Sequence, residues 1–194
     1  VLTEACHLCA ELLEQGLVSA GQFSLCVNIS PRQFRQQGFI ERVADSLLVS
    51  GLPRATLTLE ITEGIVIQNI DDTIAKMLQL KALGVGFAMD DFGTGYSSLT
   101  YLKRLPVDIL KIDQSFIRDA TLNPNDAEII RAIVAMALSL GLTVIAEGVE
   151  QQAQLELLQA QDCHLYQGYL YSQALPIPAF RALLAHAKQR PRLN

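Results

Sequence analysis

The chain has 194 residues, of which 50% are hydrophobic and 18% are charged, and this composition excludes a disordered or fibrous protein. Its 15 Lys and Arg against 20 Asp and Glu give a net charge of -5, which offers no general attraction to a nucleic-acid backbone or an anionic membrane. No apolar run approaches the roughly 20 residues of a membrane-spanning helix, and the first residues lack the features of a signal peptide. We therefore expect a soluble chain located in the cytoplasm.

Four cysteines occur without the spacing typical of a disulfide framework: Cys6, Cys9, Cys26 and Cys163. In a chain of this length we expect them to be buried small apolar side chains in a reducing compartment. Cys6 and Cys9 form a C-x-x-C pair, but no second pair follows to complete a zinc site. Because the pair shares one helical stripe with Leu2 and Leu13, packing in the core is the preferred interpretation.

Helices and short apolar strands alternate along the chain after an amphipathic helix over residues 2–13. Strands are predicted at 24–30, 56–62, 85–92, 107–113, 142–149 and 163–168. Helices are predicted at 39–51, 71–83, 97–104, 126–140, 151–159 and 178–188. Pro31 is expected to end the first strand, and Asn125 with Glu128 to form a capping box at the start of the helix near 126.

This alternation predicts an α/β fold with a parallel sheet, because parallel strands need helical crossovers. Six strands separated by helices fit an open doubly wound sheet or part of a TIM-type (β/α)8 barrel. An open sheet predicts a glycine-rich phosphate loop, and neither G-x-G-x-x-G nor the P-loop spacing occurs. We therefore favour the barrel, as a single domain over residues 1–194. The first helix has no strand before it, so we expect the barrel to lack its opening strand or strands.

Polar residues stand at the carboxyl end of every predicted strand. In chain order they are Asn28, Glu60 with Glu63, Asp90 with Asp91, Lys111 with Asp113, Glu147 with Glu150, and Gln167. In a parallel sheet these ends meet the ligand, so the side chains should converge on one rim. A single strand-end carboxylate is more often a helix cap or a solvated loop residue, and it is the joint pattern that favours a functional site.

Carboxylates held close together must be protonated, shift their pKa values or bind cations, because like charges repel. Carboxylates with the amide oxygen of Asn28, and with no His or Cys, suit Mg²⁺ or Mn²⁺ better than zinc. The adjacent Asp90 and Asp91 permit a two-metal arrangement, which acts on phosphate esters. Lys111 leaves two interpretations open, because it could orient or deprotonate a water molecule or pair with its neighbour Asp113.

The same residues carry a resemblance to a known family. The strings are N-I-S at 28–30, L-E-I-T-E at 59–63, D-D-F-G-T-G-Y-S-S-L at 90–99, L-K-I-D at 110–113, A-E-G-V-E at 146–150 and Q-G-Y at 167–169. In order and spacing they resemble the bacterial EAL domains that hydrolyse cyclic di-GMP, and the resemblance covers essentially the whole chain. D-F-G alone would suggest a kinase, but neither a glycine-rich loop nor an H-R-D string accompanies it.

This resemblance implies a metal-dependent phosphodiesterase that releases linear pGpG. The metal ligands that it implies are Asn28, Glu60, Asp90, Asp91 and Glu147. The catalytic residues that it implies are Lys111, Glu147, Asp91 and Gln167. The supporting residues are Glu63, Asp113 and Glu150. Glu63 would steady the loop after Asp91, and that loop, with Gly93 and Gly95, is thought in this family to couple the metal site to a dimer interface.

The resemblance also implies partners: cyclic di-GMP, a second copy in a homodimer, and a sensory or cyclase domain in a parent chain that is membrane-tethered in some proteins, but no DNA or RNA duplex. The string E-A-L that names the family is absent. One metal ligand is therefore expected to be missing, and these 194 residues alone are expected to turn over slowly. Two alternatives stay open: a module that binds cyclic di-GMP without cleaving it, and a different barrel enzyme that forms a metal-stabilised enolate.

Overall fold

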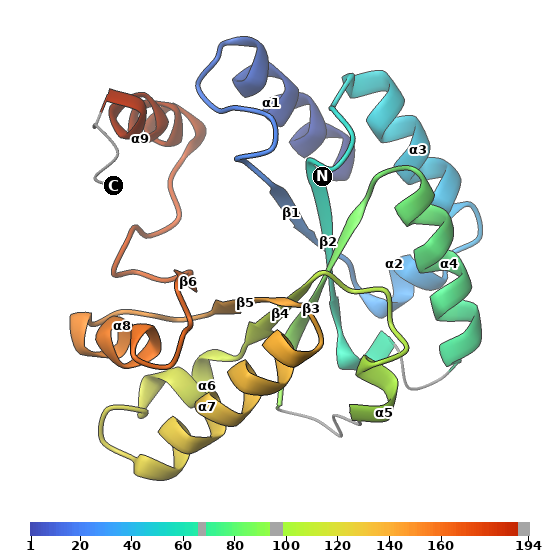
Figure 1. Ribbon diagram of the computed structural model, residues 1–194. Helices are drawn as coiled ribbons and strands as arrows, with labels where there is room; N and C mark the ends of the chain where they lie inside the picture. The colour runs from blue at the N-terminus through green and yellow to red at the C-terminus, as the bar shows by residue number, and fades with distance from the viewer. Residues whose placement is uncertain (66–68, 94–98, 190–194) are drawn as a thin grey trace.

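A parallel sheet that curls on itself forms the centre of the molecule, and the computed structural model describes it over residues 1–65, 69–93 and 99–189. Its strands in these ranges are β1 (Leu25–Asn28), β2 (Leu57–Thr62), β3 (Gly86–Phe92), β4 (Ile109–Ile112), β5 (Thr143–Ala146) and β6 (Leu165–Tyr166). They pair in the order of the chain, from β1 to β6, without a reversal. A doubly wound sheet reverses its strand order at a switch point, so this order confirms the barrel class. Figure 1 shows the six strands as a curled half-barrel with the helices around it.

The longer helices lie where the sequence predicted them, and short ones add to the set. The longer helices are α1 (Leu2–Glu14), α3 (Phe39–Ser50), α4 (Ile70–Ala82), α7 (Pro124–Ser139), α8 (Gln152–Gln159) and α9 (Ile177–Gln189). The short ones are α2 (Pro31–Arg35), η1 (Glu63–Ile65), α5 (Leu99–Leu102) and α6 (Gln114–Arg118). The predicted helix over 97–104 is therefore described only from residue 99. The sequence analysis missed α2, η1 and α6, because one or two turns are too few to show a helical period.

Two helix starts differ from the prediction. Pro31 does more than end a strand, since it opens α2 behind the side-chain cap of Ser30. α7 begins at Pro124 and is capped by Asn123, whose side chain accepts the backbone N–H of Asn125 at 3.1 Å. The predicted capping box at Asn125 and Glu128 was wrong, because proline fits the first position of a helix and moves the cap ahead of it.

The core lies between the convex face of the sheet and the helices. Along β2, Leu57, Leu59 and Ile61 are buried within the core cluster, while the alternate residues turn to the concave face. Met77 and Leu80 of α4 belong to the same cluster. The sheet thus keeps one face for packing and leaves the other for the polar side chains.

The cysteines divide between these two faces. Cys6, Cys9 and Cys163 are buried in the core, which confirms packing as the role of the C-x-x-C pair. Cys26 is exposed, so the prediction that it is buried was wrong. The reason is its place on β1, an edge strand of the sheet, where its side chain turns to the open concave face instead of the helices.

The last helix returns to the first one. Arg181 of α9 contacts Glu11 of α1 at 2.6 Å, and Lys188 donates to the backbone oxygen of Gly16 at 2.5 Å. These contacts join the last helix to the first helix and to the turn that follows it. None of the described helices combines the length and apolar character that crossing a membrane would require.

Candidate metal centre

The concave face of the sheet gathers the strand-end side chains that the sequence singled out. Asn28 lies opposite Glu60 in the register of β1 and β2, and Thr62 lies opposite Asp90 in the next pair. Since paired residues of neighbouring strands point to the same face, Asn28 and Glu60 share the concave side. Glu60, Asp90 and Lys111 are buried there although they are charged. Buried charges need partners, and these residues supply them to one another.

Lys111 of β4 is the centre of the cluster. Its Nζ lies 2.7 Å from Oε1 of Glu147, 3.0 Å from Oε2 of Glu60 and 3.0 Å from Oδ1 of Asp90. The carboxylates come from β2, β3 and the residue after β5, so the sheet brings together groups that are far apart in the sequence. Three carboxylates face one ammonium, which leaves an excess of two negative charges when all are ionised.

The surroundings raise the pKa of the lysine and of one carboxyl group in the cluster. Burial disfavours the charge of Lys111, but its hydrogen bonds to Glu147, Glu60 and Asp90 outweigh burial and raise its pKa above the ordinary value of lysine. Burial raises the pKa of Glu147 to about 7, although Lys111 acts to lower it. Without a bound metal ion, Lys111 therefore stays protonated at neutral pH, whereas Glu147 can gain or lose a proton near neutral pH.

Asp91 joins the cluster through an irregularity in β3. In a regular strand, Asp90 and Asp91 would point to opposite faces. The β3–β4 register shifts between Met89 and Phe92, and Asp91 has a φ of +55° in the left-handed region. Ligand oxygens of Asp90, Asp91 and Glu147 consequently lie within 4.8 Å of one another. Burial, followed by the charges of Asp90 and Asp113, raises the pKa of Asp91.

The other predicted residues lie around this cluster. Oε1 of Glu63 accepts the backbone N–H of Gly93 at 3.1 Å and so ties η1 to the end of β3. The loop at 94–98, which includes Gly95, lies outside the described residues. Asp113 caps α6 by accepting the N–H of Ser115 at 2.9 Å, so Lys111 pairs across the strands and not with its sequence neighbour.

Glu150 and Gln167 are both exposed at the rim of the sheet. The backbone of Gln167 donates to the oxygen of Ala146 at 2.8 Å and accepts the N–H of Val149 at 3.1 Å, which holds the segments after β5 and β6 together. The side chains of Glu150 and Gln167 remain candidates for contact with a ligand at this rim.

Sequence reasoning missed Cys26 as a residue of this face. It precedes Asn28 by two positions on β1, so strand alternation gives both residues the same side. The alternation of β1 was the signal that could have found it.

Comparisons with known proteins found a matching family model, similar sequences and similar solved structures. The model of the EAL domain matches residues 1–174. Over 176 residues the chain is 43% identical to the cyclic di-GMP phosphodiesterase NbdA of Pseudomonas aeruginosa, covering 91% of this chain and 22% of that protein. It is 41% identical, with a TM-score of 0.87, to the solved PaMucR phosphodiesterase in complex with c-di-GMP, covering 92% of this chain and 71% of that one.

A second similar structure includes a metal ion. The Klebsiella pneumoniae protein BlrP1, solved with manganese and cyclic di-GMP at pH 6, is 32% identical with a TM-score of 0.78, covering 88% of this chain and 42% of that one. The chain thus spans less than a quarter of NbdA and less than half of the BlrP1 chain.

Proposed function

The chain belongs to the EAL domain family, and we propose that it hydrolyses cyclic di-GMP to linear pGpG with the help of divalent metal ions. The observation that carries this proposal is the cluster of three carboxylates around buried Lys111 at the carboxyl edge of the sheet. NbdA is named a cyclic di-GMP phosphodiesterase, and the PaMucR structure holds c-di-GMP, which supports the same substrate here.

The cluster fits a hard divalent cation. Asp90, Asp91 and Glu147 offer oxygen atoms within 4.8 Å of one another, and Glu60 with Asn28 borders them on the neighbouring strands. The excess negative charge and the oxygen-only donors favour Mg²⁺ or Mn²⁺. The manganese in the BlrP1 structure supports this choice. A bound ion would polarise the phosphodiester and lower the pKa of a water molecule near it, and two ions could be held because Asp90 and Asp91 are adjacent.

Lys111 and Glu147 have separate roles in this proposal. Lys111 holds the carboxylates of Glu147, Glu60 and Asp90 in place as their shared counter-ion, and in this proposal it turns an N–H group to the attacking water when a cation takes over one of these carboxylates. Glu147, whose carboxylate borders both Lys111 and the oxygen atoms of Asp90 and Asp91, accepts the proton of that water. The water oxygen then bonds to phosphorus while the bond from phosphorus to the 3′ oxygen breaks, and the departing oxygen takes a proton from solvent.

The half-barrel leaves the sheet open between its first and last described strands. β1 and β6 stand at opposite ends of the sheet order, and Asn28 and Gln167 near these ends are exposed. We therefore propose that the 194 residues by themselves turn over slowly, and that hydrolysis is faster in a longer protein that contains them. Such a protein is also proposed to form a homodimer and to carry a regulatory domain. The relative MucR is named a bifunctional diguanylate cyclase/cyclic di-GMP phosphodiesterase, which supports the additional domain.

The test is incubation of cyclic di-GMP with the 194-residue chain and with the longer protein, in Mn²⁺, Mg²⁺ or EDTA, with the nucleotides separated by chromatography. Formation of pGpG that requires the metal, faster in the longer protein, is the expected result. Binding of cyclic di-GMP without pGpG would establish a receptor in place of an enzyme. If the protein neither binds nor hydrolyses cyclic di-GMP, this substrate is rejected. Light scattering of the longer protein tests whether it forms a homodimer.

A further inference from the structure

Gln154 is a buried glutamine outside the cluster, at the third position of α8 and 3% exposed. Its Oε1 accepts the backbone N–H of Glu150 at 2.8 Å and of Gln151 at 2.9 Å. Its Nε2 donates to the backbone oxygens of Ile117 at 3.2 Å and Arg118 at 3.3 Å. The amide thus makes two acceptor and two donor contacts, which matches the capacity of a glutamine side chain.

These hydrogen bonds join two segments that position the cluster. The segment 147–151 follows β5 and begins with Glu147, whose carboxylate contacts Lys111 at 2.7 Å. α6 follows β4, which carries Lys111, and Gln154 binds the carbonyls at the end of that helix. Gln154 therefore connects the backbone that carries Glu147 to the backbone that follows Lys111.

The packing between these segments leaves little space for them to shift. Gly148 has a φ of +68°, and a Cβ placed on it would lie 2.5 Å from Cβ of Gln114 at the start of α6. A Cβ on Gly168 would clash with the backbone of Val149. The segments after β4, β5 and β6 thus pack directly against one another, and this close contact is possible because Gly148 and Gly168 have no Cβ. A shift of residues 148–151 would be transmitted directly to Glu147.

We infer that Gln154 is a positioning residue that keeps the Glu147 carboxylate beside Asp90, Asp91 and Lys111. This inference rests on the proposed function and adds a residue to it. When the amide is lost, two backbone N–H groups and two carbonyls lose their partner, and the segment from Glu147 relaxes away from α6. Glu147 then leaves the position from which it serves metal binding and hydrolysis.

Two substitutions at this position separate its contacts. Gln154→Met has a similar length and removes all four hydrogen bonds. Gln154→Glu keeps acceptors for the N–H groups of Glu150 and Gln151 but loses the donors to α6. The matched control is Gln161→Met, because Gln161 also bridges to another helix, through Ala127 of α7 at 3.1 Å, and lies outside the proposed site.

The readouts are the affinity for Mn²⁺, measured by electron paramagnetic resonance of the free ion, together with kcat, KM and the melting temperature in the longer protein. Loss of a group that orients a metal ligand typically weakens metal binding by about 10- to 100-fold. We expect a loss in this range and a lower kcat for Gln154→Met, with KM unchanged. Gln154→Glu should lower both as well, because its carboxylate would face the backbone oxygens of Ile117 and Arg118, and Gln161→Met should lower the melting temperature alone.

Wild-type Mn²⁺ affinity and kcat in both Gln154 variants, with a lower melting temperature only, would overturn the inference. Should Gln154→Met fail to fold, Gln154→Glu decides: weaker Mn²⁺ binding supports the positioning role, and unchanged binding rejects it. If the wild-type protein binds Mn²⁺ but does not cleave cyclic di-GMP, the proposed function fails, while the comparison of Mn²⁺ affinities still tests Gln154. Absence of Mn²⁺ binding in the wild type would reject both.

Discussion

The lysines at the two ends of the sheet differ in burial and in the number of carboxylates that they contact. At the carboxyl end, the side chain of Lys111 is 4% exposed and meets three carboxylates. At the amino end, the side chain of Lys81 is 30% exposed and pairs with Asp108 alone, at 2.5 Å. Asp108 also accepts the backbone N–H of Phe87 at 2.9 Å, so this pair belongs to the local structure that begins β3 and precedes β4.

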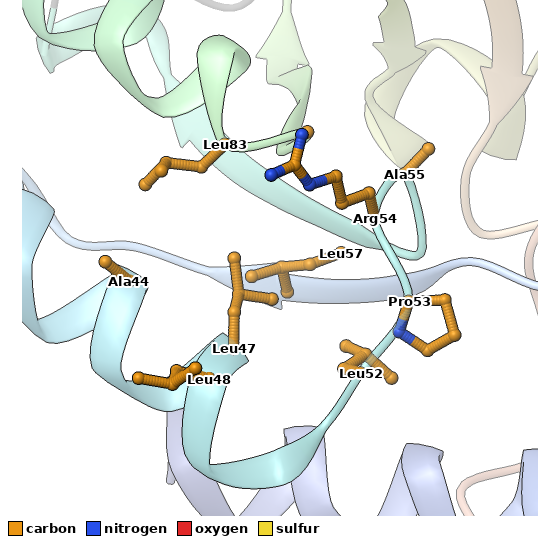
Figure 2. Close-up of a pocket in the computed structure, with 10 residues that line it drawn as sticks. Ala44, Leu47, Leu48, Leu52, Pro53, Arg54, Ala55, Leu57 and Leu83 are labelled. Atoms are coloured by element: carbon orange, nitrogen blue, oxygen red, sulfur yellow. The ribbon is translucent and has the colours of Figure 1, made fainter.

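The amino end of the sheet also borders an apolar pocket. A pocket of about 260 Å³ opens between α3, α4 and the start of β2, and Figure 2 shows its lining by leucine side chains with Arg54 across it. Leu47, Leu52 and Leu83 are among these residues. The described contacts at this end are thus apolar packing and an ion pair between one lysine and one aspartate.

The contrast between the two ends indicates that the charged cluster at the carboxyl end has a role other than stabilising the fold. Burying charged groups costs desolvation energy, and well-packed apolar residues often replace a buried ion pair without loss of stability. A cluster with more carboxylates than cations therefore does not serve stability first. Its excess negative charge is best explained by the binding of cations.

The largest effect is expected from Asp90→Asn, which removes one charge of the cluster and keeps the size of the side chain. Hydrolysis of cyclic di-GMP should fall to background because Asp90 borders both Lys111 and the other oxygen donors. Circular dichroism should show an unchanged fold. Full activity in this variant would reject the metal centre at the carboxyl end.

Lys111→Ala should lower hydrolysis on the order of 10²-fold or more, because the water loses a group that orients it. It should also destabilise the metal-free protein, because Glu60, Asp90 and Glu147 lose their shared counter-ion. Steady-state kinetics and melting in EDTA measure the two effects. A lower melting temperature with normal kinetics would reduce Lys111 to a structural ion pair.

Glu147 should make the stability of the metal-free protein depend on pH. Its pKa is raised from 4.5 to about 7 on folding, so its contribution is complete below pH 4.5 and is lost as the pH rises through 7. Glu147→Gln imitates the protonated form, and at pH 8 it should be more stable than the wild type by on the order of 1–3 kcal/mol.

Urea unfolding in EDTA at pH 4.5 and pH 8 measures this difference. The two proteins should be nearly equal at the lower pH, where the wild-type carboxyl group is protonated when folded. Parallel pH profiles for the two proteins would show that Glu147 does not titrate in this range.

The smallest effect is expected at the amino end. Lys81→Met breaks the pair with Asp108, and an exposed ion pair contributes about 0–1 kcal/mol to stability. Hydrolysis should stay at the wild-type rate, which makes this variant the control for Lys111→Ala. A loss of activity comparable to that of Lys111→Ala would show that the two ends are not independent.

The sequence was sufficient for the strands, the longer helices and the choice of the barrel over the open sheet. Apolar alternation and helix signals are local, and residues such as Gly51 and Gly141 mark where helices end. The polar residues at the strand ends could also be predicted, because parallel strands bring their carboxyl ends to one edge.

Contacts between strands could not be predicted in the same way. Local pattern gave Lys111 the neighbour Asp113, whereas the sheet gave it Glu60, Asp90 and Glu147. Cys26 was misplaced for a related reason, since burial at an edge strand depends on what covers the concave face.

By itself the sequence determined which side chains reach the carboxyl edge, because strand period and helix signals act over a few residues. Only the tertiary structure decided how those side chains meet. The positive φ of Asp91 places its carboxylate beside that of Asp90, and the amide of Gln154 joins the segment of Glu147 to α6. Both depend on packing between segments that are distant in the chain, which no local pattern encodes.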